Sequence, residues 1–320
     1  MANASVAVGT YAGVAARPYV SAAILAADTI ANGYVSVLEN VHSKAVLRKF
    51  SGAAIQANDD CAFSTPASGQ LTVGEAVLEA AALKVNEQVC NADLRATWES
   101  ALIRSQNDGA PADFVTYTAQ YVAAKVAESV EHNIWHGNFN HTTGAEAGAT
   151  YTAFDGISRH LVDNYAAGNM QQLTGATVAE EAATPDGTSI LERLAALVAE
   201  APSAIAGDPN TKLFMSRAMA QLYYQALAGE YNLPFLNDGL ATRYAGYEII
   251  TPGGMPDDTF LLSKGENLYF GTNLLTDHIQ ASILDLTGVT GDDVTRVIMQ
   301  FSAGTQVVDA PSVSFAYRTS

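Results

Sequence analysis

The sequence predicts an α+β fold organised around one long helix, residues 111–137. Strand-like segments precede this helix between residues 44 and 90, and a region of alternating helices and strands follows it from residue 189 onward. With 320 residues, of which 48% are apolar, the chain can bury one elaborate core or two smaller ones. We therefore expect several structurally distinct segments along one chain.

Residues 1–43 are expected to form an N-terminal arm. The first 30 residues are rich in alanine, glycine, valine and serine, carry few charges and show little periodicity. Side chains this small can lie close against another surface but do not build a core of their own. A partly disordered tail is the alternative.

Residues 44–90 predict an extended two-stranded ribbon. The segment Lys44–Phe50 has the composition of a strand, residues 64–69 suit a loop tip, and Leu83, Val85 and Val89 alternate with polar residues on the return. A two-stranded ribbon is only marginally stable alone in water. We therefore expect it to lie on another surface, with a second subunit as the best candidate.

Residues 91–188 are expected to contain a short helix at 91–105, the long helix and another short helix at 154–165. We call residues 111–137 the spine helix. Pro111 suits its first turn, Gly137 can supply a left-handed C-terminal stop, and its length would be about 35–40 Å. Two apolar stripes predict packing on two sides, the first with Val115, Val122, Val126, Val130 and Ile134 and the second with Phe114, Tyr117, Tyr121 and Trp135. Polar loops are expected at 138–152 and 168–187.

From residue 189 the pattern alternates between helix and strand. Ser189 followed by Glu192 predicts a capping box at the start of a helix, and a second helix is expected over Arg217–Ala228, ended by Gly229. Strands are expected at 211–216, 247–251, 259–263, 267–271, 278–286, 294–303 and 313–317.

The charge balance excludes an obvious nucleic-acid binder. The chain carries 16 basic and 33 acidic residues, a formal net charge of −17, whereas phosphate binding needs clustered lysine and arginine. The two cysteines, Cys61 and Cys90, indicate neither a zinc knuckle nor a disulfide framework. The N-terminal segment has no basic region, and the apolar run 22–27 is too short to cross a bilayer, so we expect neither secretion nor a membrane partner.

The best candidate for catalysis is the pair His132 and His136. Histidines four residues apart share a helix face and could bind zinc, with His141 nearby, so a zinc-dependent hydrolase is an alternative from a different functional class. The second position of the motif holds Asn133, where a metalloprotease of the H-E-x-x-H type needs its glutamate base. His132 also borders the aromatic stripe, where its ring can simply pack.

Other polar clusters carry no recognisable chemistry. The pairs Asp257-Asp258 and Asp292-Asp293 lack the spacing of a calcium loop and suit solvated turns. The glycines near residues 254 and 288–291 match no phosphate-binding loop, and no nucleophile elbow occurs. We assign no catalytic, cofactor-binding or metal-binding residue and expect no enzyme.

The order of segments resembles the major capsid proteins of tailed double-stranded DNA bacteriophages, of the Hong Kong phage type, whose fold is shared with encapsulin shells. Residues 246–277, GYEIITPGGMPDDTFLLSKGENLYFGTNLLTD, and residues 290–307, TGDDVTRVIMQFSAGTQV, are similar to family patterns. Residues 83–98, LKVNEQVCNADLRATW, look like the return of the family's ribbon. The likeness covers nearly the whole chain.

The resemblance implies a role for each segment. Residues 44–90 would be an extended loop on a neighbouring subunit, 91–188 a peripheral domain containing the spine helix, 189–290 an axial domain, and 291–320 strands returning to the peripheral domain. The chain would self-assemble into pentamers and hexamers of an icosahedral shell around double-stranded DNA, in a virion assembled in the host cytoplasm. Portal, scaffolding and decoration proteins would be further partners.

Two features of related shells remain open in the sequence. An encapsulin-type compartment is the closest alternative, because it shares the architecture and encloses cargo protein instead of DNA. The family's lysine–asparagine crosslink is not carried over. Lys44, Lys49 and Lys84 lie in or beside the predicted ribbon, but no asparagine partner or acid catalyst is identified.

Overall fold

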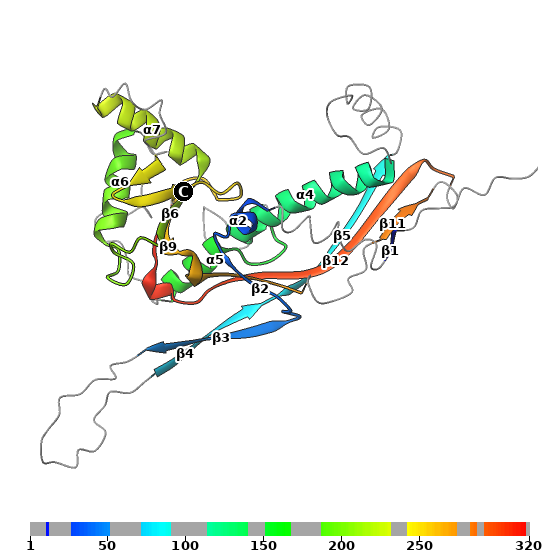
Figure 1. The fold of residues 1–320 in the computed structure, drawn as a ribbon, viewed down its shortest axis with the longest axis horizontal. Coiled ribbons are helices and arrows are strands. Elements are labelled where there is room, and N and C mark those ends of the chain that lie inside the picture. Colours follow the sequence, from blue (N-terminus) through cyan, green and yellow to red (C-terminus); the bar gives the residue numbers. More distant parts are fainter. Residues whose placement is uncertain are drawn as a thin grey trace, which may run out of the picture.

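The computed structural model describes two sheets with helices packed against them and a separate two-stranded ribbon (Figure 1). This mixture of helices with antiparallel and parallel strands confirms the α+β class. The described residues are 11–12, 27–51, 72–90, 114–139, 151–167, 187–231, 242–273, 282–286 and 291–317.

The larger sheet is built on one long strand, β12 (Val294–Val307). β11, β10 and β5 all pair antiparallel with β12, while β2 lies parallel to β10 and β1 pairs with β11. Those strands are β1 (Tyr11–Ala12), β2 (Ser36–Leu38), β5 (Ala81–Cys90), β10 (Leu268–Thr272) and β11 (Ser282–Asp285). We call these six strands the large sheet.

The ribbon is shorter than the sequence predicts. β3 (Lys44–Ser51) pairs antiparallel with β4 (Thr72–Glu79), as expected. The expectation that the ribbon extends to residue 90 is wrong, because β5 pairs along its whole length with β12. The alternation of Leu83, Val85 and Val89 marks a half-buried strand, but these side chains pack on the main core of the protein.

The spine helix is α4 (Phe114–His136), which runs along one side of β12 while the ribbon leaves on the other (Figure 1). At 1.5 Å per residue its 23 residues span about 34 Å. The first predicted stripe is confirmed where side chains are described, since Val122, Val126, Val130 and Ile134 are buried. The second stripe is interrupted: Trp135 is buried, but Tyr121 is exposed.

The end of α4 differs in detail from the prediction. The left-handed conformation belongs to Asn138, with a φ of 52°, and not to Gly137. Gly137 is required for another reason, because a Cβ there would lie 2.1 Å from the Phe154 carbonyl oxygen. This close approach is followed directly in the chain by α5 (Ile157–Ala166). The inward side chain Leu161 of α5 is buried, as predicted.

The smaller sheet has the strand order β13-β9-β6-β8-β7, and we call it the small sheet. Its strands are β6 (Thr211–Met215), β7 (Arg243–Tyr244), β8 (Tyr247–Ile250), β9 (Thr259–Lys264) and β13 (Ser314–Tyr317). Leu213 and Met215 pack in one core with α6 and α7, whereas Phe214 between them packs in the main core with Trp135. Both faces of the small sheet are therefore covered, which explains its nearly continuous apolar strands.

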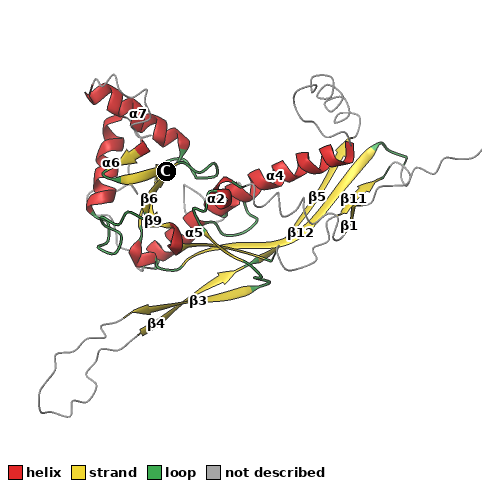
Figure 2. Cartoon of the chain, viewed as in Figure 1, coloured by secondary structure: helices red, strands yellow, loops and turns green. Residues whose placement is uncertain are grey.

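The two helices of this region are α6 (Gly187–Ala199) and α7 (Arg217–Tyr231), shown in red in Figure 2. Two predicted ends are wrong. α6 begins at Gly187, so Ser189 lies inside the helix and does not cap it, and α7 continues through Gly229 to Tyr231. Helix-end signals in sequence are weak because tertiary packing can extend a helix beyond them.

Strand pairing also crosses the segment boundaries that the resemblance implied. β10 and β11 fall within residues 189–290 but belong to the large sheet, and β13 falls within residues 291–320 but pairs with β9 of the small sheet. Each of these strands pairs antiparallel with a strand on the other side of the boundary between residues 290 and 291. The two sheets are therefore joined by several chain crossings.

Several predicted elements lie outside the described residues: the helix at 91–105, the loop tip at 64–69, and most of the loops at 138–152 and 168–187. Within the described ranges, helices of membrane-spanning length and hydropathy do not occur.

Candidate subunit-contact surface and interlobe junction

One face of the ribbon exposes an apolar stripe. Val46 lies opposite Val77 and Phe50 lies opposite Val73, so the four side chains point to the same side of the two strands. Their exposed fractions are 52% for Val46, 66% for Phe50, 52% for Val73 and 38% for Val77. Exposed apolar side chains gathered on one projecting element mark a surface for another protein.

Ion pairs alternate with these apolar pairs on the same face. Lys44 Nζ lies 2.5 Å from Glu79 Oε1, and Arg48 Nε lies 3.6 Å from Glu75 Oε1. Both are cross-strand pairs in register. Exposed ion pairs contribute little stability, about 0–1 kcal/mol each. They fix the register and leave the apolar stripe framed by charges.

The opposite face of the ribbon packs on the protein's own large sheet. Leu78 is fully buried, and a Cβ on Gly271 of β10 would lie 2.5 Å from its Cδ2. Gln306 of β12 donates through Nε2 to the Val77 carbonyl at 2.6 Å. A Cβ on Gly304 would lie 2.0 Å from the Glu79 carbonyl oxygen. Because Gly271 on β10 and Gly304 on β12 have no Cβ, the base of the ribbon can pack closely against these two strands.

A further contact attaches the ribbon through its strand β3. Lys49 forms an ion pair with Asp309, next to the short 3-10 helix η5 (Ala310–Ser312). Asp309 is itself fixed, because its N–H donates to Asn267 Oδ1 at 2.7 Å and its carbonyl accepts from Asn267 Nδ2 at 2.9 Å. Asn267 belongs to the 3-10 helix η4 (Gly265–Asn267). The ribbon is therefore attached both at its base and at Lys49, and its apolar stripe lies on the opposite face.

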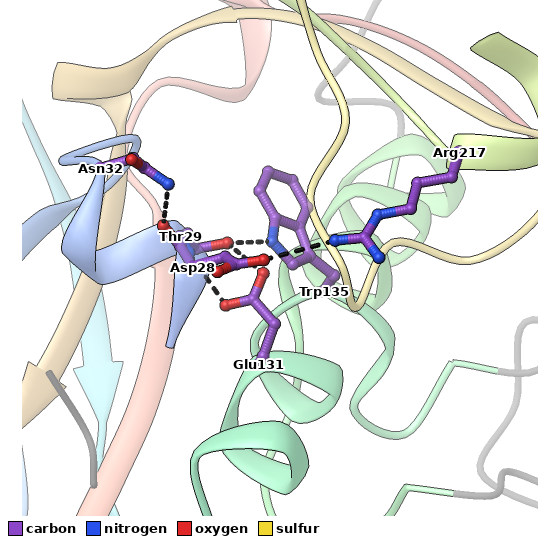
Figure 3. Close-up of polar contacts among 6 residues, drawn as sticks. All are labelled: Asp28, Thr29, Asn32, Glu131, Trp135 and Arg217. Carbon is purple, nitrogen blue, oxygen red and sulfur yellow. Dashed lines mark hydrogen bonds and ion pairs between the residues drawn. The ribbon is translucent and has the colours of Figure 1, made fainter. Parts of the chain in front are cut away.

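A buried carboxylate joins the arm to the spine helix (Figure 3). Glu131 of α4 is 5% exposed, and its Oε2 accepts a 3.0 Å hydrogen bond from the N–H of Thr29. Thr29, on α2 (Asp28–Ala31), is fully buried and donates its hydroxyl to Glu131 Oε1 at 2.5 Å. The same hydroxyl accepts from Trp135 Nε1 at 2.6 Å. One hydroxyl thus satisfies two buried groups.

The small sheet meets this junction through the turn between β8 and β9. A Cβ on Gly254 would lie 2.2 Å from the Glu131 carbonyl oxygen, so only glycine fits against the spine helix there. At the start of α7, Arg217 Nη2 lies 3.4 Å from Asp28 Oδ2 (Figure 3). Arm, spine helix and small sheet therefore meet at one point.

An aromatic side chain lines the same side of the small sheet. Tyr34 packs edge to face on Phe214, with ring centroids 6.2 Å apart, and Lys212 Nζ lies 5.2 Å from the Tyr34 ring centre. Burial raises the pKa of the Tyr34 hydroxyl, and the negative charges of Glu248 and Asp28 add to the effect. This tyrosine is a packing group and stays neutral.

The two histidines of the zinc alternative pack on one tyrosine. His132 stacks on Tyr151 with ring centroids 4.7 Å apart and planes at 3°, and the His136 ring lies 5.5 Å from the same tyrosine. His141 lies outside the described residues. Among the described histidine, cysteine, aspartate and glutamate side chains, no three gather as a metal site would require. The ring packing supports the reading of His132 as a structural residue.

The acidic pairs lie where the sequence placed them, in turns. Asp258 adopts a left-handed φ of 57° between β8 and β9, and Asp292 and Asp293 are exposed just before β12. The Gly254 turn packs on α4 and forms no phosphate loop.

Comparison with known proteins gives a result at the level of the fold. No family model and no curated protein matches the sequence. Solved structures do match. One is a chain of the satellite phage P4 procapsid including size determination (Sid) protein. It aligns with a TM-score of 0.57 and 13% sequence identity, over 93% of this chain and 97% of that one. A chain from Mycobacterium phage Che8 matches at 0.54 and 12% identity, covering 91% of each. The capsid of an empty GTA particle matches at 0.53 and 11% identity, covering 93% and 90%.

The chain therefore has the major capsid protein fold of tailed phages. The P4 and GTA structures, described as a procapsid and a capsid, are structural proteins. Two of the three structures are described as a procapsid and a capsid, and the comparison favours neither the encapsulin alternative nor the zinc hydrolase. The resemblance inferred from residues 246–277 and 290–307 is confirmed at this level.

Sequence reasoning missed the junction at Thr29 and Glu131. Thr29 lies at the edge of the segment that we described as a featureless arm, and Glu131 appears in sequence as one more polar helix residue. One signal was available: Glu131 falls one position after Val130 and four before Trp135, on the inner side of the spine helix.

Proposed function

We propose that this chain is the major capsid protein of a tailed double-stranded DNA phage, which self-assembles into pentamers and hexamers of an icosahedral shell around the genome. The observation that carries the proposal is the capsid fold over almost the whole length of both chains, 93% of this one and 97% of the P4 procapsid chain. No inserted or missing domain of appreciable size separates the two.

The apolar stripe of the ribbon supports self-association. Val46, Phe50, Val73 and Val77 form a face that the chain itself leaves uncovered among the described residues. In the proposed shell a neighbouring copy covers it. The large sheet with α4 would form the peripheral region, and the small sheet with α6 and α7 would surround the pentamer and hexamer axes.

The charge of the subunit suits a container for DNA. Packaged DNA must slide and condense, and a basic inner wall would hinder this by binding phosphate. The net charge is −17, and among the described residues eight basic side chains lie in ion pairs: Lys44, Arg48, Lys49, Lys125, Arg159, Lys212, Arg217 and Lys264. Portal, scaffolding and decoration proteins are proposed as further partners, and the virion as its location after assembly in the host cytoplasm.

The proposal is tested by sedimentation velocity of the full-length chain and of a ribbon double variant, Phe50→Ser with Val73→Thr. We expect large assemblies from the unmodified chain and a folded, small species from the double variant. Val37→Thr, which changes an exposed valine on the edge strand β2, is the matched control and should assemble normally. Normal assembly of the double variant, or an unmodified chain that never associates, would contradict the proposal.

A further inference from the structure

A histidine with a buried, unpartnered nitrogen lies at the base of the ribbon. His160 belongs to α5, and its Nε2 is buried with no hydrogen-bond partner among the described residues. Buried polar atoms in folded proteins are nearly always hydrogen-bonded, so an exception calls for an explanation. His160 takes no part in the ribbon's apolar stripe or in the junction at Glu131.

The ring lines a cavity of about 460 Å³. The cavity lies where the corner between β4 and β5 meets α5 and β12, and the end of α4 closes another side. Its wall also contains Val77, Glu79, Ala80, Ala81, Asn138, Ala153, Phe154, Asp155, Thr305 and Gln306. The wall contains both polar and apolar side chains, and the cavity is large enough to admit water. His160 therefore faces the corner from which the ribbon projects.

Specific hydrogen bonds hold that corner in place. Gln306 donates to the Val77 carbonyl at 2.6 Å, and the N–H of Ala80 donates to the Ser43 carbonyl at 2.7 Å. On the α5 side, the Thr305 hydroxyl donates to the Asp155 carbonyl at 2.5 Å. Because most of the residues that form these hydrogen bonds also line the cavity, a new charge or a new water molecule in the cavity would act directly on the bonds.

The charged groups around the ring are already engaged. Asp155 accepts from Asn138 Nδ2 at 2.7 Å, and Glu79 is paired with Lys44 at 2.5 Å. On α5, Asp163 is paired with Arg159, with Arg159 Nε 3.0 Å from Asp163 Oδ2. A proton on Nε2 would create a buried N–H⁺ donor, and the described hydrogen bonds provide no acceptor for it.

The electrostatic balance at this ring favours the neutral form. Burial lowers the pKa of His160 below its ordinary value of 6.5, although Asp155, Asp163 and a hydrogen bond to the Thr305 backbone act in the opposite direction. Arg159 reinforces the effect of burial. The unfolded chain therefore binds this proton more readily than the folded chain. The stability that the neutral ring provides is complete above about pH 6.5 and is lost as the pH falls toward the folded-state pKa.

We propose that His160 is a proton-binding site at the base of the ribbon, and that its protonation loosens the attachment of the β4–β5 corner to β12. The added charge draws either water or the Glu79 carboxylate into the cavity. Movement of the carboxylate would break the ion pair between Glu79 and Lys44. Acidification then loosens the β4–β5 corner of the ribbon while the small sheet stays folded. The inference concerns the single chain and does not depend on shell assembly.

Hydrogen exchange read by mass spectrometry tests the proposal on the full-length chain at about pH 7.5 and about pH 5.5, corrected for the intrinsic pH dependence of exchange. We expect protection of peptides that cover residues 76–82 to fall about 3- to 10-fold on acidification. Peptides from β6 serve as the internal reference and should not change.

Three variants assign the effect. His160→Gln and His160→Phe cannot take up the proton and should abolish the acid-induced loss of protection. His42→Gln, which removes an exposed histidine just before β3, should retain it. The proposal is overturned by an unchanged acid effect in both His160 variants, or by no acid effect in the unmodified chain. Failure of both His160 variants to fold at neutral pH would also overturn it, because the ring would then be needed for packing whatever its charge.

Discussion

Replacing Thr29 by valine removes one hydroxyl from the junction and leaves its shape almost unchanged. The hydroxyl donates to Glu131 Oε1 and accepts from Trp135 Nε1, and all three residues are buried. The variant therefore leaves a buried carboxylate with one hydrogen bond fewer and a buried indole N–H with no partner.

The magnitude follows from these two losses. A hydrogen bond to a charged group contributes about 1.5–3 kcal/mol, and an unsatisfied buried donor costs about 1–3 kcal/mol. We expect Thr29→Val to lower the free energy of unfolding by about 3–5 kcal/mol. For a chain of 320 residues that corresponds to a fall in Tm of about 4–7 °C.

Thermal unfolding of the unassembled subunit, followed by circular dichroism, measures the effect. Thr29→Ser is the matched control, because it keeps the hydroxyl and removes one methyl group, for about 1 kcal/mol. If Thr29→Val melts no lower than Thr29→Ser, the hydroxyl does not hold the junction together and the reasoning fails.

Three other outcomes are expected. Val126→Asp buries an unpaired charge in the middle of the spine helix at a cost of several kcal/mol and should give insoluble protein, whereas a soluble variant with an unchanged Tm would place this stripe in solvent. Gly304→Ala on β12 forces a Cβ to 2.0 Å from the Glu79 carbonyl oxygen and should lower the Tm, while Gly74→Ala on β4 of the ribbon meets only ordinary contacts at 3.8 Å and should not; equal Tm values would refute the close approach. With a net charge of −17, subunit association measured by light scattering should not weaken as salt rises from low to moderate values, and fluorescence anisotropy should detect no micromolar binding of labelled duplex at physiological salt. Tight binding of duplex DNA that is abolished by salt would contradict the interpretation of the shell as a container that does not bind DNA.

Much of the fold was predictable because its elements carry strong local patterns. The spine helix shows valines at helical spacing over several turns, and β6 and β9 are apolar because both faces of the small sheet are covered. The ribbon strand that begins at Lys44 could also be predicted from its composition. These signals depend on residues close together in the sequence.

The unpredicted features depend on residues far apart. Nothing local distinguishes β5 as a partner of β12 from β5 as part of the ribbon, because both environments suit alternating side chains. Thr29 and Glu131 are 102 residues apart, and their contact becomes visible only when α2 packs on α4. The apolar stripe of the ribbon became visible once the register of β3 and β4 placed Phe50 opposite Val73.

Electron microscopy of the purified full-length chain tests the central claim most directly. A capsid subunit with an uncovered ribbon face should form closed shells, or curved sheets and rings of five and six subunits, in which density for the ribbon of one copy lies on the next. Monomers or compact dimers alone, at every protein and salt concentration, would contradict the claim that this chain builds a shell.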